Sequence, residues 1–190
     1  MTKQQKLDAI SAFEKSEGYP SGSLLDVMIF ETAGTLSTAI RNKYSGAVGL
    51  FQFMPVTCRN LGYTVEQVAS MTFEQQLNLC KRYLLPYRSR LLNTSDRLDF
   101  YLAVLYPALI GKPDTAYMAK DRTKQIYIQN RGLDMDKDGD IQKGDIRNFF
   151  YKTVNSYRSR NGLPVLTVTA IGSFIVLLLT GYKMFFDATV

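Results

Sequence analysis

One glutamate stands where its neighbours predict acid–base chemistry. Glu31 ends the apolar run Met28–Phe30, so we expect its carboxyl group to be poorly solvated. Poor solvation raises the pKa of a carboxyl group and suits it to act as a general acid. The small-residue turn Ser45–Gly49 follows, and Gln52 then stands among Phe51, Phe53 and Met54. This is the composition of a carbohydrate cleft.

The absence of histidine restricts the chemistry further. None of the 190 residues is a histidine, and the two cysteines, Cys58 and Cys80, lack the spacing of a metal site. Nucleophilic machinery of the Ser-His-Asp or Cys-His type is therefore excluded, as are zinc sites with histidine ligands. Acid–base work has to come from Asp, Glu, Lys, Tyr or Cys.

A second acidic group has the spacing of an EF-hand loop. Carboxylates stand at loop positions 1, 3 and 5, glycine at 6, a backbone carbonyl at 7 and an apolar residue at 8. Position 12 is an aspartate, whose shorter side chain predicts modest affinity. The pattern predicts a structural Ca²⁺ site, and the alternative is a solvated acidic turn. The candidate ligands are Asp134, Asp136, Asp138, Asp140 and Asp145.

The stretch around Glu31 resembles the lytic transglycosylase family. Residues 49–55 read Gly-Leu-Phe-Gln-Phe-Met-Pro and match its Gly-Leu-x-Gln-x-Met-Pro signature, and Thr57 matches its downstream threonine. Thr32 stands where the family has a serine after the catalytic glutamate. Similarity to the phage-type branch continues through segments 71–75, 83–86 and 101–107, so the resemblance covers roughly residues 20–160.

The resemblance implies a goose-lysozyme-type fold and a role for each matched residue. Glu31 would be catalytic, and the substrate-binding residues would be Thr32, Ser45, Gly49, Gln52, Met54 and Tyr106. The family's Ala-Tyr-Asn-x-Gly motif is missing, and Tyr106 or Tyr101 is the nearest candidate for the tyrosine that faces the glutamate.

The implied reaction is cleavage of the β-1,4 bond between N-acetylmuramic acid and N-acetylglucosamine in peptidoglycan, with a 1,6-anhydro product. It needs one carboxyl group, and neither Asp26 nor Glu66 has motif support as a second. A net charge of +6 suits an anionic wall polymer. The alternatives are a hydrolysing lysozyme and a non-catalytic glycan-binding or structural virion protein.

Apolar periodicity predicts a mostly α, lysozyme-like helical domain over residues 1–160. Leu7, Ile10 and Phe13 share one helix face, and Ser21 or Ser23 is the expected N-cap of the helix that leads to Glu31. Residues 161–164, Asn-Gly-Leu-Pro, are expected to form a hinge.

A single C-terminal transmembrane helix is expected over residues 165–182, which carry no charge. Their number approaches the ~20 residues that span a bilayer. Residues 183–190 would form a short tail. Basic residues before the span and the absence of an N-terminal signal peptide predict that the domain stays on the cytoplasmic side.

A domain on the cytoplasmic side cannot reach peptidoglycan, and a bacteriophage with an internal membrane resolves this conflict. We therefore expect a virion membrane protein whose enzymatic domain faces the capsid, located in the host inner membrane during assembly. The expected partners are peptidoglycan, the lipid membrane and other virion proteins. Arg88, Arg90 and Arg97 are scattered in the sequence, so no nucleic-acid partner is expected.

Overall fold

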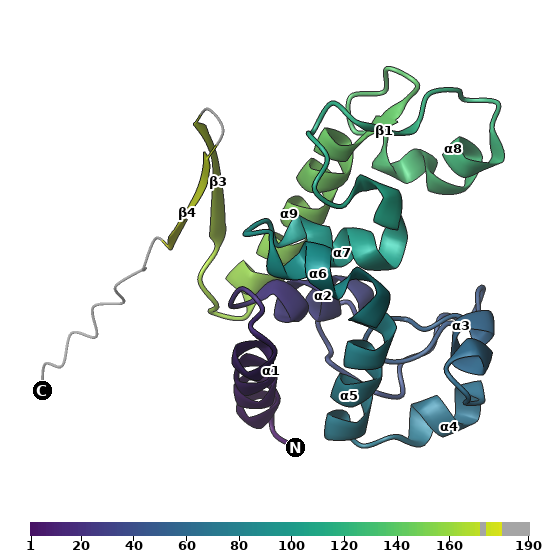
Figure 1. Ribbon diagram of the computed structural model, residues 1–190, viewed down its shortest axis with the longest axis vertical. Coiled ribbons are helices and arrows are strands. Elements are labelled where there is room, and N and C mark those ends of the chain that lie inside the picture. Colours follow the sequence, from purple (N-terminus) through teal and green to yellow (C-terminus); the bar gives the residue numbers. More distant parts are fainter. Residues whose placement is uncertain (172–173, 180–190) are drawn as a thin grey trace, which may run out of the picture.

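The computed structural model describes residues 1–171 and 174–179 of the chain, and this part is mostly helical, as predicted (Figure 1). The helices of the first half are α1 (Lys3–Glu17), α2 (Ser23–Glu31), α3 (Pro55–Asn60), α4 (Val65–Ser70), α5 (Phe73–Leu84) and α6 (Arg88–Leu92). The second half contains α7 (Leu98–Leu105), β1 (Tyr117–Ala119), α8 (Gln125–Asn130), β2 (Ile141–Gln142), α9 (Lys143–Arg160), β3 (Leu166–Ile171) and β4 (Phe174–Leu179). Short 3-10 turns follow α5, α7 and α8.

Helix α2 lies at the centre of the helical domain and carries Glu31 at its last position (Figure 1). It contacts α1, α7 and α9. Leu24, Val27, Met28 and Ile29 are all buried there. A helix that is apolar on most of its surface has to be surrounded in this way, since no face of it is suited to water.

The start of α2 differs from the prediction. Ser21 or Ser23 was the expected N-cap, but the N-cap residue is Gly22 and the capping group is the carboxylate of Glu14 in α1. This carboxylate accepts hydrogen bonds from the backbone N–H groups of Gly22 (2.6 Å), Leu24 (2.7 Å) and Leu25 (3.1 Å). A negative charge at the positive end of the helix dipole is a stronger cap than a serine hydroxyl.

The acidic loop lies between α8 and α9. Strand β2 follows its glycine and pairs with β1 in an antiparallel ladder, with Tyr117 opposite Gln142 and Ala119 opposite Ile141. Helix α9 begins inside the predicted loop, at Lys143, and runs back across the domain to contact α2. One helix therefore joins the loop to the helix that carries Glu31.

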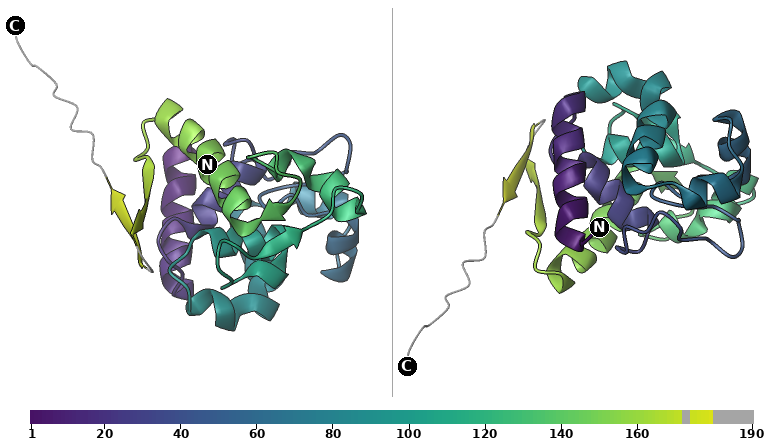
Figure 2. Two further views of the ribbon diagram at one scale, coloured as in Figure 1. Left: turned by 90° about the horizontal axis from the view of Figure 1, so that it is seen from above. Right: turned by 90° about the horizontal axis from the view of Figure 1, so that it is seen from below.

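The predicted helix over residues 165–182 is wrong for the residues that the structure describes there. Leu166–Ile171 and Phe174–Leu179 are two antiparallel strands, with Leu166 opposite Leu179 and Ile171 opposite Phe174. Figure 1 and Figure 2 show these strands at one side of the helical domain, beyond the C-terminal end of α9. None of the helices in the described part of the chain has both the length and the apolar character that a bilayer crossing requires. Residues 172–173 and 180–190, which include the predicted tail, lie outside the described residues.

Composition explains the difference. The segment is rich in Val, Ile and Thr, whose branched Cβ atoms favour the extended backbone over the helix. An uncharged run does not by itself distinguish a helix from a strand pair, because periodicity is lost when every position is apolar.

Residues 161–164, the predicted hinge, are tied back to α9. The Leu163 N–H donates to the Arg158 carbonyl at 2.9 Å, and the Arg158 guanidinium donates to the Pro164 carbonyl at 3.2 Å. Just beyond, the Asn155 side chain exchanges two hydrogen bonds with the Leu166 backbone, at 2.7 and 2.9 Å. The link between the domain and β3 is therefore hydrogen-bonded along its length.

Candidate functional site

Glu31 has the environment that its sequence context predicts. It is partly exposed, and burial alone raises the pKa of its carboxyl group from 4.5 to about 8. Within the described chain, no charged group or hydrogen bond acts to lower this pKa. Glu31 is therefore largely protonated at neutral pH, which is the state of a general acid.

Two tyrosines lie near Glu31, one from α5 and one from α7. The negative charge of Glu31 helps to raise the pKa of both Tyr83 and Tyr101, although burial is the larger cause for each. The pKa of Tyr83 rises to about 12. Both phenols consequently keep their protons, and the hydroxyl of Tyr83 donates to the Ala103 carbonyl at 3.4 Å.

Tyr101 is held by an aromatic cluster from three helices. Its ring stacks on Phe150 of α9, with centroids 4.7 Å apart and planes at 17°. Phe30 precedes Glu31, and its ring centroid lies 4.6 Å from that of Tyr101 and 5.4 Å from that of Phe150. The apolar surroundings of Glu31 are thus built by α2, α7 and α9 together.

Tyr106, the first candidate for the tyrosine that faces Glu31, ends α7. Its backbone N–H donates to the Leu102 carbonyl at 2.8 Å, and its partly buried side chain packs against the core. A substrate contact from Tyr106 stays a prediction. Tyr83 was missed, because nothing in the sequence of α5 distinguishes it from an ordinary core aromatic.

The segment 49–55 forms a tight turn that packs against Tyr83, the tyrosine of α5 whose pKa the charge of Glu31 helps to raise. Val48 and Phe53 exchange two backbone hydrogen bonds, at 3.1 and 2.8 Å. The rings of Phe51 and Phe53 lie 6.3 and 5.8 Å from the ring of Tyr83. Tyr83 therefore lies between the turn and the catalytic candidate.

Gln76 of α5 holds this turn and is fully buried. Its amide oxygen accepts from the Leu50 N–H at 3.0 Å, and its amide nitrogen donates to the carbonyls of Thr38 (2.7 Å) and Val68 (2.6 Å). Gly49 has φ +79°, and a Cβ there would lie 2.5 Å from the Gln76 amide oxygen. Glycine is required at position 49 because the backbone approaches Gln76 so closely.

The other residues predicted to bind substrate occupy three kinds of position. Thr32 is buried, and its hydroxyl donates to Met28 at 2.6 Å and accepts from Leu36 at 3.0 Å, so it fixes the turn after Glu31. Gln52 has φ +46°, and its amide nitrogen donates to the Gly49 carbonyl at 3.1 Å, which leaves its amide oxygen for a ligand. Ser45 and Met54 are exposed. Their contacts with a substrate stay predictions.

The predicted calcium loop brings carboxylates together. Oxygens of Asp134, Asp136 and Asp138 lie within 4.8 Å of one another. Asp134 is 8% exposed, and its Oδ1 is buried without a hydrogen-bond partner, as is Oδ1 of Asp140. Unpartnered buried carboxylate oxygens are costly without a cation, so this donor set fits a hard metal ion such as Ca²⁺.

Asp140 and Asp145 lie outside this group of oxygens, and Oδ2 of Asp145 accepts from the Gln142 N–H at 2.9 Å. Burial raises the pKa of both, and the charges of Asp134, Asp136 and Asp138 add to that rise. The loop also has a cation that the sequence did not indicate, since Arg122 donates to the Lys137 carbonyl at 2.9 Å. A Cβ on Gly139 would lie 1.9 Å from the Arg122 side chain, so the glycine at loop position 6 leaves room for this arginine.

Helix α9 connects the loop to the surroundings of Glu31 through buried ion pairs. Lys143 is 2% exposed, and its ammonium lies 2.7 Å from Oδ1 of Asp99, which is 1% exposed. Asp99 precedes Tyr101 by two residues on α7. One turn further along α9, Arg147 binds Asp96 at 2.7 Å and Asp114 at 2.8 Å.

No protein-family model matches the chain, and no curated protein matches it either.

The raised pKa of Glu31 predicts a pH-dependent loss of stability. Between pH 4.5 and about 8 the folded protein binds a proton at Glu31 that the unfolded chain releases, so the free energy of unfolding falls as pH rises through this window. Glu31→Gln removes that loss. From pH 4.5 to 9 we expect it to gain up to about 5 kcal/mol over the wild type in urea unfolding, because each unit between the two pKa values is worth 1.36 kcal/mol.

The control for this measurement is Glu74→Gln, an exposed glutamate of α5. It should keep the wild-type pH dependence. The same pH dependence in Glu31→Gln and the wild type would contradict the raised pKa.

Gln76→Met keeps the volume of the side chain but removes its hydrogen bonds. The Leu50 N–H and the carbonyls of Thr38 and Val68 then lose their buried partner. At about 1–3 kcal/mol for each buried group left unsatisfied, we expect a loss on the order of 3 kcal/mol in chemical denaturation. Asn78→Met, at an exposed position of the same helix, should change stability by less than about 0.5 kcal/mol. If Gln76→Met lowers the free energy of unfolding no more than the control does, Gln76 does not stabilise the turn.

Proposed function

We propose that the protein is a peptidoglycan lytic transglycosylase with Glu31 as its single acid–base catalyst. The observation that carries the proposal is a carboxyl group whose pKa burial raises to about 8, at the end of α2 and beside Tyr83 and Tyr101. The match of residues 49–55 and Thr57 to the family signature supports it, because the turn they form meets Tyr83.

The mechanism uses one carboxyl group twice, first as an acid and then as a base. Glu31 donates its proton to the glycosidic oxygen as the bond from that oxygen to C1 of the muramoyl residue breaks. The Glu31 carboxylate then takes the proton of the C6 hydroxyl as the C6 oxygen bonds to C1 and closes the 1,6-anhydro ring. Glu31 ends protonated as it began, and no water is consumed.

The positions of the other acidic residues support a mechanism with one carboxyl group. Asp26, on α2, is buried between Arg97 and Arg158 and is hydrogen-bonded to both. Glu66 is largely exposed and pairs with Arg41 at 3.5 Å. Hydrolysis by paired carboxylates needs a second group placed across the scissile bond, and these two candidates are engaged elsewhere.

The decisive experiment is digestion of purified peptidoglycan with mass spectrometry of the products. We expect 1,6-anhydromuramoyl ends from the wild type, and a loss of about 10²–10⁴ in rate for Glu31→Gln. Because Glu31 must be protonated to act, the rate should fall as pH rises above about 8. Glu66→Gln is the matched control and should keep activity.

The products separate the alternatives. Reducing muramoyl ends would indicate a hydrolysing lysozyme. Binding to peptidoglycan without cleavage, with Glu31→Gln binding equally well, would indicate a non-catalytic glycan-binding or virion structural protein.

The loop Asp134–Asp145 is proposed to hold a structural Ca²⁺ through Asp134, Asp136, Asp138, Asp140 and Asp145. The unpartnered oxygens of Asp134 and Asp140 support this assignment. The ion would stabilise the start of α9, where Asp145 lies in the first turn.

Calcium should therefore raise the melting temperature of the full chain, by an amount that grows with its concentration because the ion binds only the folded state. At a concentration of 100 Kd the gain corresponds to about 2.7 kcal/mol. Asp134→Asn should abolish most of the shift, whereas Asp121→Asn, outside the loop, should keep it. Equal melting with calcium and with EDTA would contradict the site.

Residues 165–182 are proposed to attach the protein to a lipid membrane, which would be the internal membrane of a virion, with other virion proteins as neighbours. The uncharged composition of the segment supports attachment. That no nucleic acid is among the partners stays a prediction.

Attachment is measured by alkaline carbonate extraction of membranes from cells that express the full chain. The wild type should stay in the membrane fraction, and Leu178→Lys should be released, because a charge in an apolar segment opposes insertion. Asn148→Lys, on the exposed side of α9, is the control and should stay with the membrane. Extraction of the wild type would overturn membrane attachment.

A further inference from the structure

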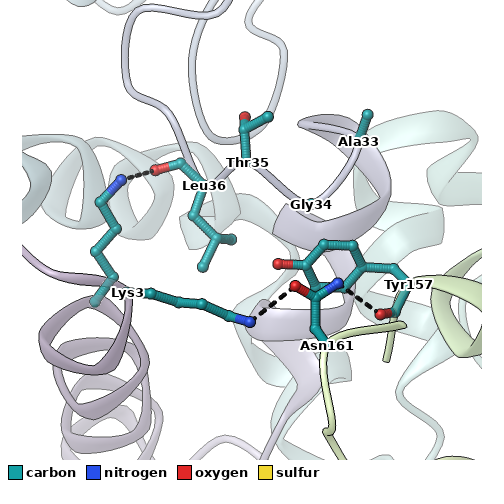
Figure 3. A pocket seen from close by; sticks show the side chains of 8 residues that line it. Lys3, Ala33, Gly34, Thr35, Leu36, Tyr157 and Asn161 are labelled. Atoms are coloured by element: carbon teal, nitrogen blue, oxygen red, sulfur yellow. Dashed lines mark hydrogen bonds between the residues drawn. The ribbon is translucent and has the colours of Figure 1, made fainter. Parts of the chain in front are cut away.

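A cavity of about 380 Å³ lies beside the turn that follows Glu31. Figure 3 shows its walls. Lys3 and Lys6 of α1 form one side, the turn Ala33–Leu36 forms another, and Tyr157 and Asn161 at the end of α9 form the third. The cavity therefore joins the N-terminal helix, the end of α9 and the segment next to the catalytic candidate.

The cavity has two positive charges without a negative partner. The Lys3 ammonium donates to Oδ1 of Asn161 at 2.9 Å, and the Lys6 ammonium donates to the Leu36 carbonyl at 2.7 Å. In the part of the chain that the structure describes, neither ammonium lies in an ion pair, whereas Lys81 pairs with Glu17 at 2.7 Å. Since an ammonium has three donors, each lysine keeps its charge and two N–H groups for a ligand.

The turn that forms the second wall has an unusual backbone. Ala33, Gly34 and Leu36 have φ of +47°, +77° and +49°. Residues other than glycine adopt this conformation at a cost and keep it where the surrounding structure fixes it, often at ligand sites. Gly34 packs so closely on Tyr157 that a Cβ would lie 1.8 Å from its ring.

Chain length places this turn next to Glu31. Ala33 follows Glu31 by two residues, so their Cα atoms are at most about 7.6 Å apart. A group bound in the cavity therefore lies within the length of a short peptide from the sugar that Glu31 acts on.

We infer that the cavity binds a carboxylate of the peptide stem carried by the glycan, with Lys3 and Lys6 as its ligands. This inference rests on the proposed function. The stem is attached to the muramoyl residue whose C1 reacts, so it begins close to Glu31, and Ala33 in the wall of the cavity follows Glu31 by two residues. Lys3 and Lys6 stand three residues apart on one face of α1, and together they would bring two positive charges and free N–H groups to the carboxylate.

The test compares two substrates for the full-length protein. One is peptidoglycan with its stems, and the other is glycan stripped of stems by an amidase. The double variant Lys3→Gln, Lys6→Gln should lower the ratio of kcat/KM on stem-bearing over stripped strands at least about tenfold, since a hydrogen bond to a charged group is worth that factor. Lys15→Gln, near the other end of α1, is the matched control and should keep the wild-type ratio.

The other outcomes overturn the inference. An equal loss on both substrates would mean that Lys6 acts only on the turn, and an unchanged ratio would mean that the cavity takes no stem carboxylate. Binding of the wild type to phosphatidylglycerol vesicles that is lost in the double variant, with the ratio unchanged, would assign the lysines to a lipid phosphate. If the wild type cuts neither substrate, the proposed function itself is refuted. This outcome is distinct from the others because it is seen with the wild type alone.

Discussion

The site depends on keeping positive charge away from one buried carboxyl group. Helix α2 carries both Asp26 and Glu31, and both carboxyl groups have a raised pKa because burial is the largest cause. Asp26 has Arg97 and Arg158 as partners, whose charges oppose that rise, whereas no charge opposes it at Glu31. The buried cations of the neighbouring helices are matched to other acids, Lys143 to Asp99 and Arg147 to Asp96 and Asp114. Glu31 can hold its proton at neutral pH because, within the described chain, no charged group opposes the effect of its burial.

Much of the fold and part of the site could be predicted from local sequence. The apolar run before Glu31 predicted a poorly solvated carboxyl group, because a carboxylate at the end of such a helix has few polar neighbours. The spacing of aspartates and glycine predicted the loop at 134–145, since a ligand pattern of this kind is encoded in consecutive residues. Both predictions depend on residues that are close together in the sequence, and a local sequence pattern is enough to describe them.

The features that were missed depend on contacts between distant residues. Gln76 binds Leu50, 26 residues away, and Thr38, 38 residues away. In the sequence it is one polar residue in an amphipathic helix. Three other contacts also join residues that are distant in the sequence: Glu14 caps α2, Tyr83 lies near Glu31, and Arg122 packs on Gly139. The strands at 166–171 and 174–179 were missed for a different reason, since a uniformly apolar run has no period from which to distinguish a helix from a strand.

Helix α9 has one more property that follows from its length alone. Asp145 in its first turn lies 13 residues before Arg158 and 15 before Arg160, and at 1.5 Å for each residue these separations are about 20 and 22 Å. The Debye length at physiological ionic strength is about 8 Å, so charges at the C-terminal end of the helix are screened from the loop. The helix joins its two ends rigidly, but the charges at one end have little electrostatic effect at the other. The ion affinity of the loop is therefore set by its own carboxylates and by Arg122 beside them, and not by the charges at the end of α9.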